Sequence, residues 1–265
     1  DDVSVVSNPE FLREGSAVAD FLKPDRVVIG SDDRAAALDT AELYSSLNAP
    51  IMITDPASAE TIKYASNAFL ATKLSFINAV AAVCEAVGAD VADVVTGMGY
   101  DTRIGREFLR PGPGWGGSCF PKDTLAMVRI AADAGYDFGL LKGVVEVNDQ
   151  QFDRVVDKIR RGVAGPLEGA TVALWGLTFK ARTDDLRDSP ALEVAERLSK
   201  AGAKVVAYDP TVEPGRSDPS LESVQVTATA LEAVTGADVL AVMTEWDQFR
   251  WVDLGEVAEA MSGAT

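Results

Sequence analysis

The 265-residue sequence predicts an α/β protein in three segments, in which a helical middle lies between two segments of alternating strands and helices. Three observations support this prediction. Short apolar runs alternate with helical patterns at both ends, apolar residues recur at helical spacing through the middle, and a Gly/Pro-rich linker, GVAGPLEG, precedes the last segment. We expect boundaries that give residues 1–54, 55–162 and 163–265.

The first segment opens with VSVV, which is typical of a short strand, and Asn8 and Pro9 suit the N-cap and first turn of a following helix. DRVVIGS and PIMITD predict two further strands, and DRAAALDTAELYSSL between them has helical spacing. This alternation starts in mid-pattern. We therefore expect the tail of a Rossmann domain whose front is absent.

The middle segment begins with SAETIKYASNAFLATKLSFINAVAAVCEAVGAD, which predicts one long helix that ends at Gly88. VADVVTGMG predicts a short helix, a Gly/Pro-rich loop spans 99–118, and two more helical patterns follow. The last segment predicts a Rossmann-like domain, because TVALWGL and AKVVAYDP are strand-like and SPALEVAERLSKAG between them is helical. It stops after a helix, so we expect the C-terminus to be incomplete as well.

The composition excludes several classes of partner. The formal charge of −17, from 41 acidic and 24 basic residues, repels nucleic acid and anionic lipid surfaces. The apolar runs are shorter than the roughly 20 residues of a membrane helix, so we expect no membrane span and a soluble cytoplasmic protein. The absence of histidine and the presence of only two cysteines argue against a metal site, a histidine triad and a disulfide framework.

The segment GGSCFPKD places a thiol in an unusual setting. Pro121 suits the first turn of the helix PKDTLAMVRIAADAG, so Cys119 lies just outside a helix N-terminus, where unpaired N–H groups favour a thiolate. Lys122 adds positive charge nearby. Cys84, in the apolar run NAVAAVCEAVG, is instead expected in the core.

A formal GxGxxG at Gly112, Gly114 and Gly117 is not a dinucleotide fingerprint, because no strand precedes it and Pro111 and Pro113 forbid the tight turn. The glycines favour a close approach of backbone to a ligand beside Cys119, and a plain surface loop is the alternative.

A spacing of four also pairs side chains on one helix face: Glu10 with Glu14, Lys63 with Asn67, and Cys119 with Asp123. Such pairs are common on solvated faces. Lys63, among apolar positions, either extends its amine to water or has a functional role.

The segment LWGLTFKARTDDLRDSP follows a strand and precedes a helix, which is where open α/β sheets hold ligands. Its cations Lys180, Arg182 and Arg187 favour a phosphorylated ligand, and a structural cluster of ion pairs is the alternative.

Five segments together resemble the UDP-glucose/GDP-mannose dehydrogenase family in order and spacing: NPEFLREGSA, KYASNAFLATKLSFINA, DTRIG, GWGGSCFPKD and LTFKARTDDLRDSP. The resemblance covers nearly the whole chain. It implies an N-terminal NAD-binding Rossmann domain, a central helical domain that forms a homodimer around one long helix, and a C-terminal domain for a nucleotide sugar.

The resemblance also implies catalytic roles. Cys119 is similar to a nucleophile that adds to a C6 aldehyde, after which a second hydride transfer to NAD leaves a thioester for hydrolysis. Lys63, Asn67 and Asp123 are similar to residues that hold a water and stabilise charge on the oxygen at C6. Glu14 resembles the glutamate that assists hydrolysis.

The binding residues implied by the resemblance form two groups. Glu14, Lys122 and Arg187 resemble residues that touch NAD, and Arg103 resembles an arginine that reaches the substrate from the partner subunit. The nucleotide sugar would contact Glu10, Phe11, Leu12, Arg13, Lys63, Asn67, Phe108, Leu109, Arg110, Pro111, Gly112, Gly116, Phe179 and Lys180.

The chain departs from the family pattern in one main respect. The glycine fingerprint, a cofactor aspartate and a catalytic threonine would lie before residue 1, so we expect this chain alone to be inactive with NAD. The leading hypothesis is oxidation of UDP-glucose to UDP-glucuronate. The alternatives are a GDP-mannose or UDP-N-acetylhexosamine 6-dehydrogenase, a non-catalytic nucleotide-sugar-binding dimerisation module, and a thiol hydrolase or acyltransferase.

Overall fold

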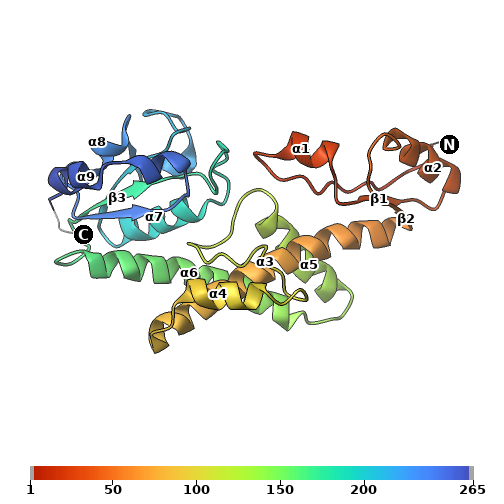
Figure 1. The fold of residues 1–265 in the computed structure, drawn as a ribbon, viewed down its shortest axis with the longest axis horizontal. Coiled ribbons are helices and arrows are strands. Elements are labelled where there is room, and N and C mark those ends of the chain that lie inside the picture. Colours follow the sequence, from red (N-terminus) through yellow and green to blue (C-terminus); the bar gives the residue numbers. More distant parts are fainter. Residues whose placement is uncertain (1–2, 263–265) are drawn as a thin grey trace. The chain divides into compact units, whose positions relative to one another are not determined.

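The computed structural model describes residues 3–262, and the chain divides into two compact units, Asp1–Phe69 and Leu70–Thr265 (Figure 1). Parallel sheets and a block of helices with one long member confirm the predicted α/β class. The three segment boundaries remain a prediction.

The first unit contains a two-stranded parallel sheet, in which Val27 of β1 (Val27–Gly30) lies opposite Ile51 of β2 (Ile51–Thr54). Helix α2 (Arg34–Leu43) connects the strands, and the Asp33 carboxylate caps its first turn. Strand β1 is fully buried, and it packs with Ala37 of α2. A six-residue helix, α1 (Ala17–Leu22), has no buried residue.

The opening of the chain differs from the prediction. VSVV, residues 3–6, forms no strand. The next residue, Ser7, pairs with Gly30 in an isolated antiparallel bridge. Asn8 caps no helix, because its side chain donates a hydrogen bond to the Val28 carbonyl at 2.7 Å, a tertiary contact that replaces a local cap. Residues 8–13 are therefore not helical, and the prediction that Glu10 and Glu14 share a helix face is wrong.

The long helix α3 (Pro56–Val87) confirms the predicted element, and Gly88 ends it with φ of 76°. Its most apolar window has a mean hydropathy of 1.5, so by length and composition alone α3 could span a membrane. The expectation of no membrane span is based on uninterrupted apolar runs, which are short, and it remains a prediction. Core helices of soluble proteins have the same composition.

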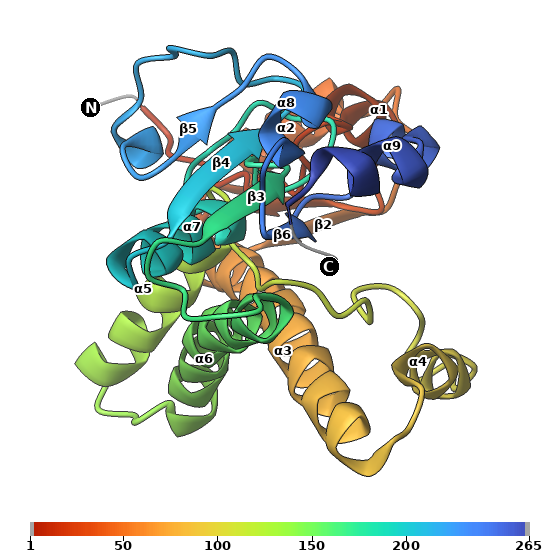
Figure 2. The ribbon, with the colours of Figure 1, turned by 90° about the vertical axis from the view of Figure 1, so that its left-hand side faces the viewer.

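Three further helices complete the helical block: α4 (Val91–Gly99), α5 (Phe120–Asp133) and α6 (Gly139–Gly162). Helix α6 contacts α5 and is joined to α3 by a hydrogen bond from the Ser75 hydroxyl to the Val144 carbonyl at 2.8 Å (Figure 2). These contacts hold α3 and α6 together on either side of the loop that leads to Cys119.

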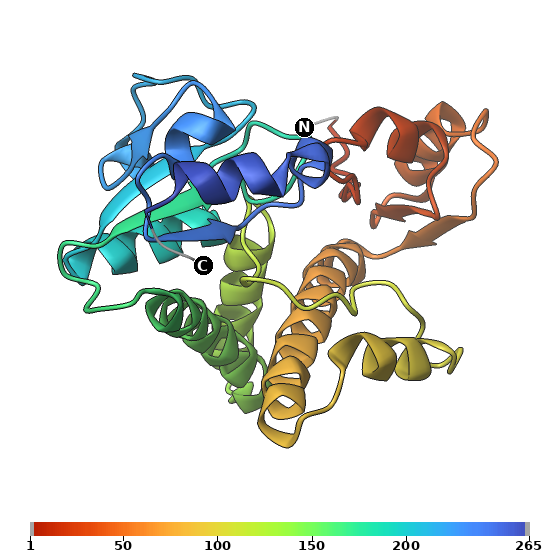
Figure 3. The same ribbon diagram turned by 60° about the vertical axis from the view of Figure 1, so that its left-hand side comes forward.

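The last segment is a four-stranded parallel sheet of order β5-β4-β3-β6, covered by helices on both faces (Figure 3). Val172 and Leu174 pack toward α7 and α6, whereas Ala173 and Trp175 pack toward α8 and α9. The alternation gives a doubly wound domain whose carboxyl strand ends lie at one edge. Its elements are β3 (Thr171–Trp175), α7 (Pro190–Lys200), β4 (Lys204–Tyr208), η1 (Pro219–Leu221), β5 (Gln225–Val226), α8 (Ala230–Val234), β6 (Val239–Val242), η2 (Asp247–Trp251) and α9 (Leu254–Ala260).

Candidate active site

Cys119 is the N-cap residue of α5, as the position of Pro121 predicts. Its side chain is half-buried, and the Ser118 hydroxyl lies 3.5 Å from Sγ. The other cysteine, Cys84, is buried in α3, which confirms its predicted place in the core. A reagent from solvent can therefore reach one thiol much more easily than the other.

The glycines before Cys119 allow two close backbone approaches. A Cβ on Gly116 would lie 1.8 Å from the carbonyl oxygen of Asp188, and a Cβ on Gly117, at φ of 80°, would lie 2.8 Å from the Phe179 ring. Only glycine fits at these two contacts. The segment before Cys119 is thus seated directly against the loop that follows β3.

The first turn of α5 carries a buried carboxylate. Asp123 is 2% exposed, its backbone N–H donates to the Cys119 carbonyl, and its carboxylate lies 3.3 Å from the Lys122 amine. The next residue, Thr124, has a buried hydroxyl without a hydrogen-bond partner among residues 3–262. A buried hydroxyl of this kind is commonly satisfied by an ordered water or a ligand.

Within the first unit, the structure brings together three of the predicted site residues. The Lys63 amine donates to the Glu10 carbonyl at 2.6 Å and to its carboxylate at 2.9 Å, and it lies 5.5 Å from the centre of the Phe11 ring. Asn67, one turn further along α3, is buried. One carboxylate oxygen of Glu14 is buried as well.

Arg13, a predicted ligand contact, is held by α1. Its guanidinium and backbone N–H both donate to the Asp20 carboxylate, at 2.6 and 2.9 Å. These hydrogen bonds, chiefly the side-chain one, lower the pKa of Asp20 well below its usual range. The contact gives the exposed Arg13 side chain a defined orientation; Leu12, the residue before it, is exposed.

The loop after β3 contains the cations that the sequence singles out. The Lys180 amine lies 5.2 Å from the centre of the Phe179 ring. Arg182, at a left-handed φ of 67°, binds Asp247 at 2.7 Å, which raises the pKa of the arginine and lowers that of the aspartate. Arg187 binds Asp185 at 2.8 Å. The two arginines thus take part in ion pairs, as the structural alternative expects.

Sequence reasoning missed Asp209, which organises the edge where β3 and β4 end. This buried carboxylate accepts hydrogen bonds from the backbone N–H groups of Leu177 and Thr178, at 2.7 and 3.2 Å, and from the Trp246 indole at 3.2 Å. It therefore fixes the backbone just before Phe179. The signal available in the sequence was a single aspartate directly after a strand, in AYDP.

The remaining predicted residues lie in the loop before α5. Phe108 has a left-handed φ of 60°, and its ring centre lies 6.3 Å from that of Phe120. Leu109 is buried, and Arg110 is exposed with its guanidinium 3.8 Å from the Glu245 carboxylate. Arg103 is bound to Asp101, which raises the pKa of the arginine. Pro111 and Gly112 line a cavity of about 940 Å³.

The described residues supply only part of a site for NAD. Strand β1 ends with one glycine, Gly30, and the turn after β3 begins with one glycine, Gly176. A Cβ would meet Ala59 at 2.5 Å in the first case and Thr244 at 2.4 Å in the second. Neither turn is a glycine-rich cradle for pyrophosphate. The side chains of Lys122 and Arg187 are largely exposed and would supply positive charge.

The chain matches three domains of one protein family. Residues 1–48 match the NAD binding domain of the UDP-glucose/GDP-mannose dehydrogenase family, residues 57–150 its central domain, and residues 173–265 its UDP binding domain. A UDP-glucose 6-dehydrogenase of Bacillus subtilis (strain 168) is 47% identical over 259 residues, which are 98% of this chain and 59% of that protein. The chain thus spans about three fifths of that relative's length.

Two solved structures are similar in fold over almost the whole chain. The UDP-glucose dehydrogenase from Pyrobaculum islandicum has a TM-score of 0.88 at 40% identity, covering 94% of this chain and 58% of that chain. The UDP-D-ManNAc dehydrogenase from Pyrococcus horikoshii has a TM-score of 0.83 at 25% identity, covering 98% of this chain and 59% of that chain.

Proposed function

Because the chain belongs to the UDP-glucose/GDP-mannose dehydrogenase family, we propose that the protein is an NAD-dependent oxidoreductase that converts the C6 alcohol of UDP-glucose to the carboxylate of UDP-glucuronate. The observation that carries this proposal is a half-buried thiol at the N-terminus of α5, one turn from the buried Asp123. The identity of 47% to a UDP-glucose 6-dehydrogenase favours UDP-glucose. GDP-mannose and UDP-N-acetylhexosamines are the alternative substrates.

The chemistry divides a four-electron oxidation into two hydride transfers. NAD, when bound, would supply the hydride acceptor, and the two transfers would use two NAD molecules in turn. Between the two transfers, the Cys119 thiol adds across the C=O bond of the C6 aldehyde, with sulfur bonding to carbon and the proton passing to oxygen, and gives a thiohemiacetal. Loss of the second hydride from C6 and of the hydroxyl proton leaves a thioester. Water then attacks the carbonyl carbon, the C–S bond breaks, and the carboxylate and the thiol are released.

Other side chains of the chain assist these steps in the proposal. Lys63 and Asn67 stabilise negative charge on the oxygen at C6, and the buried Asp123 orients a water. Glu14 accepts a proton from the hydrolytic water. Phe179 and Lys180, held by the backbone that Asp209 fixes, contact the nucleotide sugar.

The test is turnover by the full-length protein with three sugar nucleotides. We expect two NADH for each UDP-glucose consumed, and much slower turnover with GDP-mannose and UDP-N-acetylglucosamine. Faster oxidation of either alternative would reassign the substrate. Absence of NADH with all three would contradict the dehydrogenase assignment.

A non-catalytic nucleotide-sugar-binding module is the second candidate for the chain by itself, because the turns after β1 and β3 lack a pyrophosphate cradle. Calorimetry on residues 1–265 separates the two. Binding of UDP-glucose without binding of NAD supports the module, whereas binding of both supports a catalytic unit.

We also propose a cytoplasmic homodimer formed through the helical block. Phe76, Val83 and Val87 lie on one face of α3 by their spacing of seven and four, and each is more than half exposed. An apolar face of this kind is typical of an interface. The substitution Phe76→Lys is expected to shift the sedimentation coefficient from dimer to monomer, and an unchanged value would place the interface elsewhere.

A further inference from the structure

We propose that polar side chains of α3 and α6 are positioning residues for the Cys119 sulfur, acting through the loop Gly112–Trp115. The four side chains of α3 and α6 are those of Ser75, Asn78, Asn148 and Gln151, and we call them the loop clamp. The inference rests on the proposed function, because it takes Cys119 as the reacting thiol. It adds residues that touch neither substrate nor cofactor in that proposal.

One half of the clamp holds Trp115 at both its backbone and its ring. Asn148 accepts from the Trp115 N–H at 2.8 Å and donates to the Trp115 carbonyl at 3.0 Å. The indole N–H donates to the Ser75 hydroxyl at 2.8 Å, and that hydroxyl donates in turn to Val144. Ser75, Trp115 and Asn148 are each at most 6% exposed. Water is thus excluded from these bonds.

The other half of the clamp holds Gly112. Its N–H donates to the Asn78 amide oxygen at 2.8 Å, and its carbonyl accepts from the Gln151 amide at 2.8 Å. The loop has no regular secondary structure, so side chains supply the partners that a sheet or helix would supply. Loss of one clamp amide would leave a backbone group of the loop unsatisfied in a poorly hydrated place.

The clamp affects the position of Cys119 because the backbone after Trp115 has little room to move. Gly116 and Gly117 abut Asp188 and Phe179 without room for a side chain, and the next residue but one is the N-cap of α5. The backbone from Trp115 to Cys119 is therefore fixed along its length. A nucleophile gains rate only when it is held within a fraction of an ångström of its attacking position.

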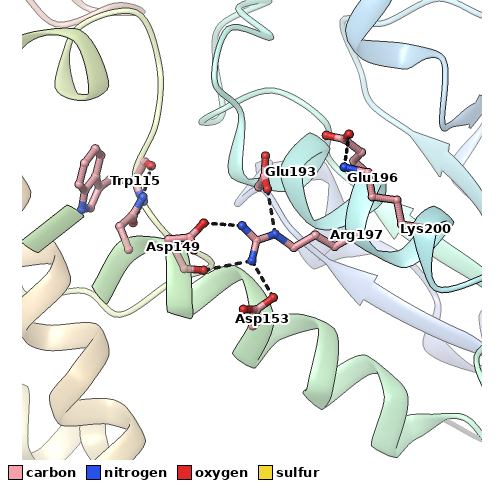
Figure 4. Close-up of polar contacts among 8 residues, drawn as sticks. Trp115, Asp149, Asp153, Glu193, Glu196, Arg197 and Lys200 are labelled. Carbon is pink, nitrogen blue, oxygen red and sulfur yellow. Dashed lines mark hydrogen bonds and ion pairs between the residues drawn. The ribbon is translucent and has the colours of Figure 1, made fainter. Parts of the chain in front are cut away.

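Helix α6 connects the clamp to the last domain. Asn148 faces the loop, and the following residue, Asp149, binds Arg197, which extends from α7 (Figure 4). Arg197 also donates to Asp153 at 2.6 Å and to Glu193 at 2.8 Å. The same stretch of α6 thus carries the cysteine loop on one side and α7 on the other.

The experiment compares Asn148→Leu and Asn148→Asp with the control Gln150→Leu in the full-length protein. Leucine removes both bonds to Trp115, and aspartate keeps the acceptor alone. Gln150 lies on the same helix but is exposed, and its amide donates to Glu146. Three quantities are measured: amide exchange of the loop, alkylation of Cys119 by iodoacetamide followed by peptide mass spectrometry, and kcat and KM with UDP-glucose.

For Asn148→Leu we expect amide exchange of the loop to accelerate about tenfold. Alkylation of Cys119 should accelerate about threefold, because the half-buried sulfur becomes more accessible. The kcat should fall by about two orders of magnitude, whereas KM should stay within about twofold of the wild-type value. Asn148→Asp lies between this variant and wild type, and Gln150→Leu equals wild type. Unchanged loop exchange would overturn the proposal. Faster loop exchange together with kcat and alkylation rates equal to those of Gln150→Leu would also overturn it, because Asn148 would then have a purely structural role.

Two designs keep the test decisive. If Asn148→Leu does not fold, Gln151→Met removes the bond to the half-buried Gly112 carbonyl and carries the same expectations. If the wild-type protein oxidises no sugar nucleotide, the proposed function fails. Exchange and alkylation still report whether the clamp sets the exposure of Cys119, because they need no turnover.

Discussion

Replacing Gly116 by alanine tests how closely the cysteine loop is seated against the last domain. The added Cβ would lie 1.8 Å from the Asp188 carbonyl oxygen, whereas ordinary contacts begin near 3.4 Å, so one backbone must retreat by about 1.6 Å. The Asp188 backbone cannot retreat easily, because the Ser189 hydroxyl donates to the Leu177 carbonyl at 2.6 Å. We expect a loss of about 3 kcal/mol in the free energy of unfolding.

The matched control is Gly112→Ala in the same loop. A Cβ there meets no atom within 4 Å, so the expected change is within about 0.5 kcal/mol. All four tryptophans lie at or after Trp115, so tryptophan fluorescence during urea unfolding reports the second unit alone. Equal unfolding midpoints for the two variants would refute the close approach of Gly116 to Asp188.

Three other predictions concern chemistry, domain contact and pH. Cys119→Ala is expected to abolish formation of the acid in the full-length protein, and undiminished acid by chromatography would exclude the thioester route. Arg197→Met removes three ion pairs of a side chain that is 20% exposed, so the free energy of urea unfolding should fall by about 1–2 kcal/mol. The control is Lys200→Met, which removes one exposed ion pair and should cost less. Equal losses in the two variants would contradict the larger contribution expected of Arg197. The lowered pKa of Asp20 means that its stabilising effect is fully present above pH 3.8 and is lost progressively as the pH falls from 3.8 toward the lower pKa of the folded state. Asp20→Asn should therefore have a lower urea midpoint than wild type at pH 7, with a difference that shrinks at pH 3, and a difference that grows would refute the assignment.

Much of the fold could be predicted because periodicity and end signals agree. Helix α3 has apolar residues at helical spacing and a glycine directly after its end, and local pattern and packing there require the same structure. The helix start predicted at Asn8 is wrong because one tertiary hydrogen bond, from Asn8 to Val28, outweighs local capping propensity. Strand β5 has two residues, too few for any periodic signal.

The site was predictable where one residue type implies one local geometry. Pro121 marks the first turn of α5 and so places Cys119 at its N-cap. Gly116 was identified as a ligand contact, but its small size is also required by the Asp188 carbonyl, a neighbour 72 residues away in sequence that no local pattern reveals. Asp209 was missed for the same reason, since its hydrogen-bond donors come from two other segments.

The most direct test of the central claim is the mass of the Cys119 peptide during the first turnover of the full-length protein with UDP-glucose and NAD, stopped in acid at successive times. A covalent uronyl group on the Cys119 sulfur, rising and then falling as the acid appears, is the predicted result. Acid that accumulates while the peptide keeps its unmodified mass at every time would contradict it.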